Sequence, residues 1–184
     1  MVKLNKIYTR TGDDGSTGLA DGSRRPKDDV RLMAIGSVDE TNAALGLVRL
    51  NAAGALDTLL AQMQNDLFDL GADLATPSDD IAWTPIRIKA AQVTALEVAL
   101  DAYNESIAPL TSFILPAGTA LSAHLHLART TARRAERDTV GLARVEAVNP
   151  EVVKYLNRLS DLLFVLARHA NDDGRGDVLW VPSK

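Results

Sequence analysis

The most regular feature of the chain is the spacing of its apolar residues, which recur every three or four positions along most of its length. Such steps place side chains on one face of an α-helix, and they are typical of helices that pack in a bundle. The clearest run is Leu56, Leu60, Met63, Leu67, Leu70 and Leu74. The pattern predicts helices over about 27–50, 55–76, 86–104, 119–142 and 150–171.

The two ends of the chain depart from this pattern. Residues 1–26 carry glycines at close intervals among Asp, Ser and Thr, and this glycine density excludes a helix. Residues 172–184 are glycine-rich and then apolar, which indicates a tail that docks back on the helices. We predict a single all-α domain over 1–184, with a glycine-rich loop segment (1–26), an up-and-down five-helix bundle (27–171) and a C-terminal tail (172–184).

Composition narrows the class of protein. Aromatic residues make up only 4% of the chain, so Leu, Ala, Val and Ile must fill the core, and Leu and Ala favour helix. The net charge of -4 argues against a nucleic-acid partner. The chain has no cysteine, which excludes disulfides and thiolate metal sites. It has neither a signal-peptide pattern nor an apolar run long enough to span a membrane, so we expect a cytoplasmic protein.

The glycine-rich segment is the first candidate for chemistry. Glycines allow backbone N–H groups to converge on an anion, and the neighbouring hydroxyl groups add donors. The segment lacks the Gly-Lys-Ser/Thr ending of a Walker A motif, and a hairpin with a glycine-rich turn is the alternative. Lys27 could add a positive charge for a phosphate, although taken alone it is more simply a solvated surface lysine. The candidate phosphate-binding residues are Thr9, Arg10, Thr11, Gly12, Ser16 and Thr17.

A charged stripe is predicted on the helix over 119–142. Arg129, Arg133, Glu136 and Arg137 recur at helical spacing beside the apolar face. Guanidinium groups at such a boundary can clamp a triphosphate, and Glu136 can orient an arginine or help to bind a metal. The alternative is a solvated face with ion pairs between successive turns.

Two further polar positions lie near apolar seams. Asn157 and Asp161 are one turn apart and could bind a base or a ribose, or could form an ordinary surface pair. Asp39 lies among small and apolar residues, where a carboxylate needs a partner such as an arginine of the 119–142 helix. The sequence shows no HExxH motif and no Ser/His/Asp arrangement. The predicted chemistry therefore needs neither a protein nucleophile nor a transition metal bound by the protein.

Six short segments together resemble the PduO-type ATP:cob(I)alamin adenosyltransferases. Their order and separation make the resemblance specific, and it runs from about residue 7 to the apolar tail. One departure is Ala117, where members of the family often have glycine. The segments are YTRTGDDG (8–15), RPKD (25–28), SVDET (37–41), FILP (113–116), RRAER (133–137) and YLNRLSD (155–161).

The resemblance implies a five-helix bundle that forms a homotrimer with active sites between subunits. It implies that Asp39 pairs with Arg129, and that Phe113 keeps the lower axial face of cobalt free. Magnesium would accompany ATP, with Glu136 as the candidate residue near it. The resemblance places ATP against the glycine loop, Lys27, Arg133, Arg134, Glu136, Arg137 and Asn157.

The implied reaction suits these residues. Co(I) of cobalamin is a strong nucleophile that attacks C5′ of ATP and expels triphosphate, so the protein needs to orient the substrates and to bind the departing charge. An adenosylcobalamin-dependent client enzyme and a reductase are the expected protein partners. Two rival functions are a regulator that senses ATP without turnover and a carrier that delivers the finished cofactor.

Overall fold

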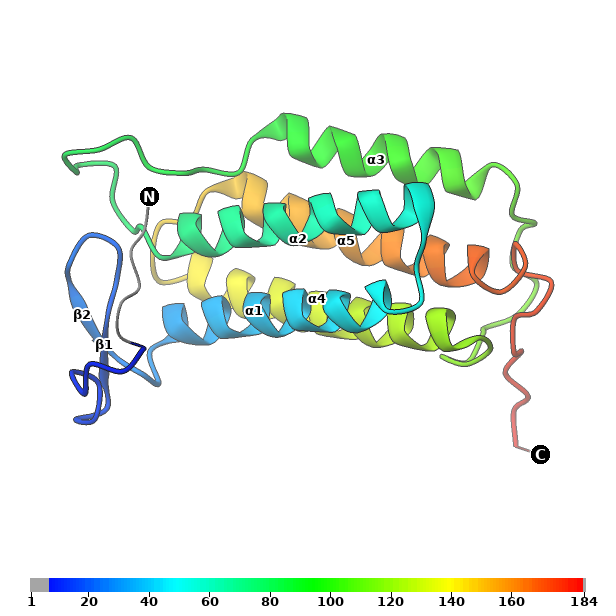
Figure 1. Cartoon of the computed structure of the whole chain (residues 1–184), viewed down its shortest axis with the longest axis horizontal. Coiled ribbons are helices and arrows are strands. Elements are labelled where there is room, and N and C mark those ends of the chain that lie inside the picture. The colour runs from blue at the N-terminus through cyan, green and yellow to red at the C-terminus, as the bar shows by residue number, and fades with distance from the viewer. Residues whose placement is uncertain (1–6, 184) are drawn as a thin grey trace.

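The structure of the chain, a computed structural model, describes residues 7–183; residues 1–6 and 184 of the predicted segments lie outside it. The predicted helical fold is confirmed, with a short antiparallel hairpin before the first helix (Figure 1). The hairpin strands are β1 (Ser16–Gly18) and β2 (Arg24–Pro26). The helices of the described part are α1 (Val30–Arg49), α2 (Gly54–Leu74), α3 (Ala90–Asn104), α4 (Ala120–Ala143) and α5 (Pro150–His169).

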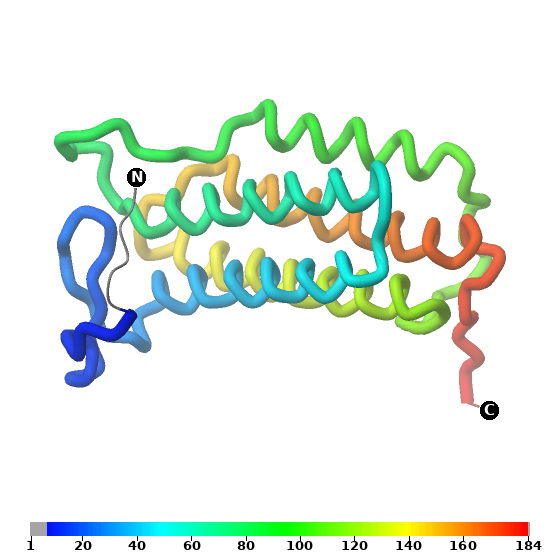
Figure 2. The backbone as a smooth tube through the Cα atoms, in the orientation of Figure 1, coloured from blue at the N-terminus to red at the C-terminus, as the bar shows by residue number. Residues whose placement is uncertain are grey.

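The helices lie side by side along one direction, and α4 occupies a central place among them. It packs against α1 on one side and α5 on the other, while α2 packs on α1 and α3 packs on α5. The hairpin lies beyond one end of the bundle and the C-terminal tail lies at the opposite end (Figure 2). None of the helices in the described part combines the length and apolar content that crossing a bilayer requires.

Leucine and alanine fill the core, as the low aromatic content predicts. The predicted apolar stripe of α2 is buried, and α5 contributes the longest series of buried side chains. On α4, Ala128, Ala132 and Ala135 are completely buried. Because alanine side chains are short, they let α4 approach its neighbours closely.

Buried polar groups tie the helices together. The Tyr155 hydroxyl on α5 donates to the Asp66 carboxylate on α2 over 3.0 Å, and Gln92 on α3 donates to the same carboxylate over 2.9 Å. Burial and the negative charge of Asp66 raise the pKa of Tyr155 well above its ordinary value. Three helices therefore share one carboxylate, which fixes their relative position.

Two helices begin later in the chain than the sequence predicted. The first helix begins at Val30 rather than near residue 27, because Pro26 belongs to β2 and the Lys27 N–H still donates to the Gly15 carbonyl at 2.8 Å. Asp29 caps α1 by accepting from the Arg31 N–H at 2.8 Å. The third helix begins at Ala90 rather than near residue 86, since the chain before it runs extended.

Candidate active site

The glycine-rich segment folds into a defined loop that leads into the hairpin. The Asp14 carboxylate accepts from the Ser16 N–H at 2.9 Å and from the Ser16 hydroxyl at 2.7 Å. These bonds from Ser16 hold the pKa of Asp14 below its ordinary value. Gly15 has a φ of 84°, a conformation that favours glycine. Arg24 closes the loop by donating to the Thr11 carbonyl at 2.6 Å. The loop is thus shaped by its own side chains before any ligand binds.

Lys27 lies against this loop. A methyl group added to Gly12 would lie 3.2 Å from the Lys27 Nζ, so the ammonium group sits directly beside the glycine backbone. The structure therefore brings Lys27 and the predicted phosphate-binding loop together. A glycine at this position leaves room for that approach.

Glu146 attaches the hairpin to the bundle. It lies in the connection between α4 and α5, and it accepts from Arg25 of β2 at 3.2 Å and from Arg31 of α1 at 2.9 Å. Arg31 is only 2% exposed, and it also donates to the Leu74 carbonyl at 2.7 Å. This role was not predicted, because Glu146 lies outside every helical pattern.

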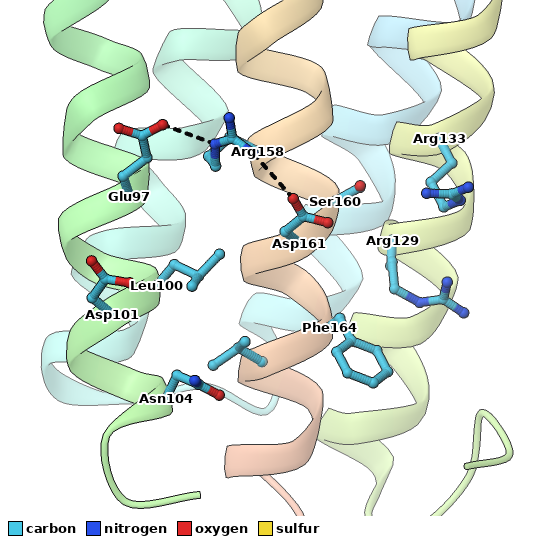
Figure 3. A pocket seen from close by; sticks show the side chains of 11 residues that line it. Glu97, Leu100, Asp101, Asn104, Arg129, Arg133, Arg158, Ser160, Asp161 and Phe164 are labelled. Atoms are coloured by element: carbon cyan, nitrogen blue, oxygen red, sulfur yellow. Dashed lines mark hydrogen bonds and ion pairs between the residues drawn. The ribbon is translucent and has the colours of Figure 1, made fainter. Parts of the chain in front are cut away.

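A second group of candidate residues lines a pocket of about 690 Å³ on the side of the bundle (Figure 3). Arg129 and Arg133 of α4 lie on one side of α5, and Glu97 and Asp101 of α3 lie on the other. Arg158 of α5 pairs with Glu97 at 2.9 Å. The two walls of the pocket consequently carry opposite charges. The remaining lining residues are Leu100, Asn104, Ser160, Asp161, Phe164 and Val165.

The side of the pocket formed by Arg129 and Arg133, the positive wall, is not neutralised within the described residues. Neither Arg129 nor Arg133 forms an ion pair with a carboxylate there. Burial, and then the nearby charge of Arg133, lower the pKa of Arg129. Two adjacent guanidinium groups of this kind favour an anionic ligand or a carboxylate from another chain.

The other residues of the predicted stripe divide between different neighbours. Glu136 accepts a hydrogen bond from the Asn157 amide at 2.9 Å, so these two predicted ATP-binding residues lie together. Arg137 donates to the Arg133 carbonyl at 3.2 Å. Arg134 points to α1 instead, where it pairs with Glu40. Within residues 7–183, no group of three or more His, Asp or Glu side chains is arranged to hold a metal ion.

Asp39 and Arg129 do not form an ion pair among the described residues. The pairing that the resemblance implies is therefore not made inside one subunit. The contacts between α1 and α4 are instead the Ser37 hydroxyl with Asp138, and Glu40 with Arg134. Asp39 is exposed on α1. Arg129 instead lines the pocket together with Phe164 of α5.

Phe113 lies at the end of the bundle opposite the hairpin, where the tail docks. Its ring is 76% exposed and meets the Trp180 ring edge to face, with centroids 6.1 Å apart. The Trp180 N–H donates to the Phe113 carbonyl at 2.8 Å, and the Leu115 N–H donates to the Val178 carbonyl at 2.7 Å. A short backbone pairing therefore holds Phe113 in place.

The departure at Ala117 does not disturb this turn. The next residue, Gly118, adopts the positive φ of 107° that the turn requires. A side chain on Gly118 would collide with the amide of Asn171, which donates to the Ala117 carbonyl at 3.1 Å. The glycine that the turn needs is thus present one position later.

The candidate residues form separate groups in a single chain. The hairpin lies beyond one end of the bundle, and the connection between α3 and α4 lies at the other end (Figure 1). The glycine loop and Lys27 belong to the first region, Phe113 belongs to the second, and the arginine pocket is lined by α3, α4 and α5. A ligand that contacts all of them would have to be bound by more than one copy of the chain.

Comparison with known proteins decides which family the arrangement represents. Residues 7–170 match the family model described as cobalamin adenosyltransferase. The chain belongs to the cobalamin adenosyltransferase family. It is 53% identical to the corrinoid adenosyltransferase of Mycobacterium tuberculosis, over 98% of this chain and 95% of that protein. It is 48% identical to the cobalamin adenosyltransferase of Cupriavidus metallidurans, over 97% of this chain and 95% of that protein.

A solved structure of the family has the same fold. A single-site variant of the PduO-type ATP:corrinoid adenosyltransferase from Lactobacillus reuteri, complexed with cobalamin and ATP, is 39% identical and has a TM-score of 0.90. The match covers 96% of this chain and all of that chain. The family, the helical fold and the class of enzyme, a transferase, predicted from the sequence are therefore confirmed.

Proposed function

We propose that the chain transfers the 5′-deoxyadenosyl group of ATP to Co(I) of a corrinoid, in active sites formed between the subunits of a homotrimer. The Co(I) electron pair forms the cobalt–carbon bond, the C5′–oxygen bond breaks, and triphosphate leaves with the electrons of that bond. The observation that carries the proposal is the Arg133 guanidinium on a pocket wall, which forms no ion pair among the described residues. Fixed positive charges of this kind stabilise a leaving group whose charge grows in the transition state.

The ATP would be bound by two regions of different subunits. The glycine loop and Lys27 of one subunit would hold the triphosphate together with Arg133 of its neighbour, and Glu136 and Asn157 of that neighbour would hold the rest of the nucleotide. The preformed loop beside the Lys27 ammonium supports this division. The remaining candidate contacts are Thr9, Arg10, Thr11, Ser16, Thr17, Arg134 and Arg137.

Magnesium would enter with ATP rather than occupy a site made by the protein alone. Glu136 is the candidate carboxylate for this magnesium ion, and a hydrogen bond from Asn157 fixes its position. Magnesium keeps several waters and is commonly bound through one or two carboxylates and phosphate oxygens. Glu136 would therefore act through a coordinated water or as a single ligand.

The trimer would bring Asp39 to Arg129 of a neighbouring subunit. Asp39 is exposed on α1, one residue before Glu40, which lines an apolar groove of about 420 Å³ together with Ala43, Leu47 and Leu127. An exposed apolar groove near a carboxylate that has no ion pair among the described residues suits contact with a second copy. Sedimentation equilibrium should give three times the mass of the chain, whereas a fully active monomer would refute shared sites.

The Asp39–Arg129 pair has its own test. If the two charges meet between subunits, Asp39→Asn and Arg129→Leu should each weaken corrinoid binding more than ATP binding. The double variant should then lose less than the sum of the single losses, because the second substitution removes a group that is already without its partner. Strict additivity would show that the residues do not interact.

Phe113 would meet the corrin ring. A large exposed aromatic side chain held by backbone pairing is suited to cover a flat apolar face, here the lower axial face of cobalt. The expected partners outside the trimer are a reductase that supplies Co(I) and a client enzyme that uses the adenosylated product. We expect this exchange to occur in the cytoplasm.

The deciding experiment is anaerobic incubation of the protein with cob(I)alamin and MgATP, followed by the absorbance change on adenosylation. We expect stoichiometric triphosphate and a light-sensitive cobalt–carbon bond. Binding of ATP without formation of that bond would favour the regulator. Release of supplied adenosylcobalamin to a mutase by a protein with no turnover would favour the carrier.

A further inference from the structure

One buried polar group beside the pocket has no part in the reaction described above. The imidazole of His126, on α4, is only 2% exposed and lies behind the positive wall. Its Nδ1 accepts a hydrogen bond from the Arg129 Nε–H at 3.4 Å. Its ring also meets the Phe164 ring of α5 edge to face, with centroids 6.1 Å apart. Both contacts of His126 are thus with side chains that line the pocket.

The hydrogen bond determines the state of the ring. Nδ1 can accept from Arg129 only when the imidazole is neutral and its proton is on Nε2. Among the described residues, Nε2 is buried and has no hydrogen-bond partner. Nothing else therefore competes with Arg129 for the orientation of the ring. The other histidine of α4 near this end, His124, is less buried and contacts Asn51 instead.

The surroundings favour the neutral ring. Burial, and then the positive charge of Arg129, lower the pKa of His126, while the negative charge of Asp177 acts in the opposite direction. Asp177 belongs to the tail and is itself paired with Arg168 at 2.8 Å. The residue that α5 presents to the ring, Phe164, carries no charge. The charged neighbours that act on His126 are thus Arg129 of its own helix and Asp177 of the tail.

We propose that neutral His126 is a positioning residue that holds the Arg129 guanidinium at the pocket wall, where it meets Asp39 of the partner subunit and the corrinoid. The role rests on the proposed function. Protonation of Nδ1 would replace the acceptor with a second positively charged donor, and the two cations would repel each other. Corrinoid binding should then weaken as the pH falls, while ATP binding should not change through this group.

Two substitutions separate positioning from packing. His126→Asn places an amide oxygen close to the position of Nδ1 and cannot titrate, so Arg129 keeps its acceptor at every pH. His126→Leu fills the space and removes the acceptor. His124→Asn is the matched control, because it replaces a histidine on the same helix that does not contact Arg129.

The measurement is the dissociation constant of cobalamin by equilibrium dialysis between about pH 5 and pH 8, the range in which histidine titrates. We expect His126→Leu to weaken cobalamin binding about fivefold at neutral pH, the effect of losing one long hydrogen bond to a charged group. The wild type should weaken at acid pH and His126→Asn should not. Carboxylates such as Asp39 titrate mainly below this range.

Three results would overturn the proposal: unchanged cobalamin binding in folded His126→Leu, an acid dependence that persists in His126→Asn, or one that His124→Asn removes. If His126→Leu fails to fold, the comparison of the wild type with His126→Asn still decides. The dissociation constant of ATP, measured by the same dialysis, serves as an internal control, since a general loss of structure would raise it as well. Dialysis needs no turnover, so absence of adenosyl transfer would contradict the proposed function without affecting this test.

Discussion

The two ends of the bundle hold their candidate residues by different means. At the hairpin end, ionised side chains make the connections: Arg25 and Arg31 both bind Glu146. At the opposite end, backbone hydrogen bonds join the tail to the segment of Phe113, and the Arg168–Asp177 pair anchors the tail. A single substitution at Glu146 can cut the first kind of connection, whereas the backbone bonds at Phe113 do not depend on its side chain. Substitutions at the hairpin end should therefore act through the position of the loop, and substitutions at Phe113 should act through the ring itself.

The largest expected effect on stability comes from Glu146→Ala. This change leaves the buried Arg31 guanidinium without its carboxylate, and loss of one partner of a buried pair costs about 3 kcal/mol. The midpoint of urea unfolding should fall, and the KM for ATP should rise because the hairpin loses its attachment. Glu105→Ala, at an exposed glutamate after α3, is the control and should change neither quantity. If both variants behave alike, the hairpin is held by something other than Glu146.

The next effect is on catalysis, at the arginine pocket between the two ends. Arg133→Ala should remove about 2–4 kcal/mol of transition-state stabilisation, because one charge-assisted contact to the leaving triphosphate is lost. The value of kcat/KM should fall accordingly while the fold remains intact. Steady-state kinetics with cob(I)alamin and MgATP measure the loss. Arg175→Ala is the matched control, since this exposed arginine lies outside the pocket and pairs with Asp172, three residues earlier. Activity close to that of the wild type in folded Arg133→Ala would contradict the assignment of the pocket.

Phe113→Ala tests the end of the bundle opposite the hairpin. The ring is exposed, so its removal should change the free energy of unfolding by less than about 0.5 kcal/mol. Adenosylation should slow and the KM for the corrinoid should change, while the KM for ATP stays constant. Chemical unfolding and two-substrate kinetics test both halves. An altered KM for ATP would show that the two ends are not independent.

The smallest effect is a pH dependence of stability. The pKa of His126 is lowered in the folded state, so the unfolded chain binds a proton more readily than the folded chain. Stability should therefore fall as the pH drops below the ordinary pKa of histidine, and it should level off once the folded state is protonated too. Urea unfolding at several pH values should give a steeper acid loss for the wild type than for His126→Asn. Parallel curves would mean that His126 is not the group responsible.

The sequence predicted the helices well because their apolar spacing repeats over several turns. The predicted start of the first helix was wrong for a physical reason. Pro26 is compatible with a helix start, but the N–H of Lys27 donates to the Gly15 carbonyl and this bond keeps the chain in the hairpin. The third helix was predicted to start too early for a similar reason. Ile88 is buried, but it lies in an extended segment rather than in a helix. Local pattern fixes the type of an element better than its boundary.

The candidate site was less accessible to sequence reasoning. The stripe on α4 was visible from its spacing, but the direction of each arginine depends on the register of α4 with α1 and α5. The contact of Arg134 with Glu40 depends on that register, so spacing could not predict it. The contact of Arg129 with His126 lies within one turn of α4, but spacing could not show that His126 is buried. Glu146 was missed because its partners are distant in the chain.

The alanine face of α4 has a consequence for how variants of the family should be interpreted. Ala128, Ala132 and Ala135 are completely buried, so larger side chains there would push α4 away from its neighbours. The guanidinium groups of Arg129 and Arg133 lie beside this face on the same helix, and they would move with it. A substitution such as Ala132→Val should thus impair the enzyme as severely as the loss of a charge, while every charged residue is retained.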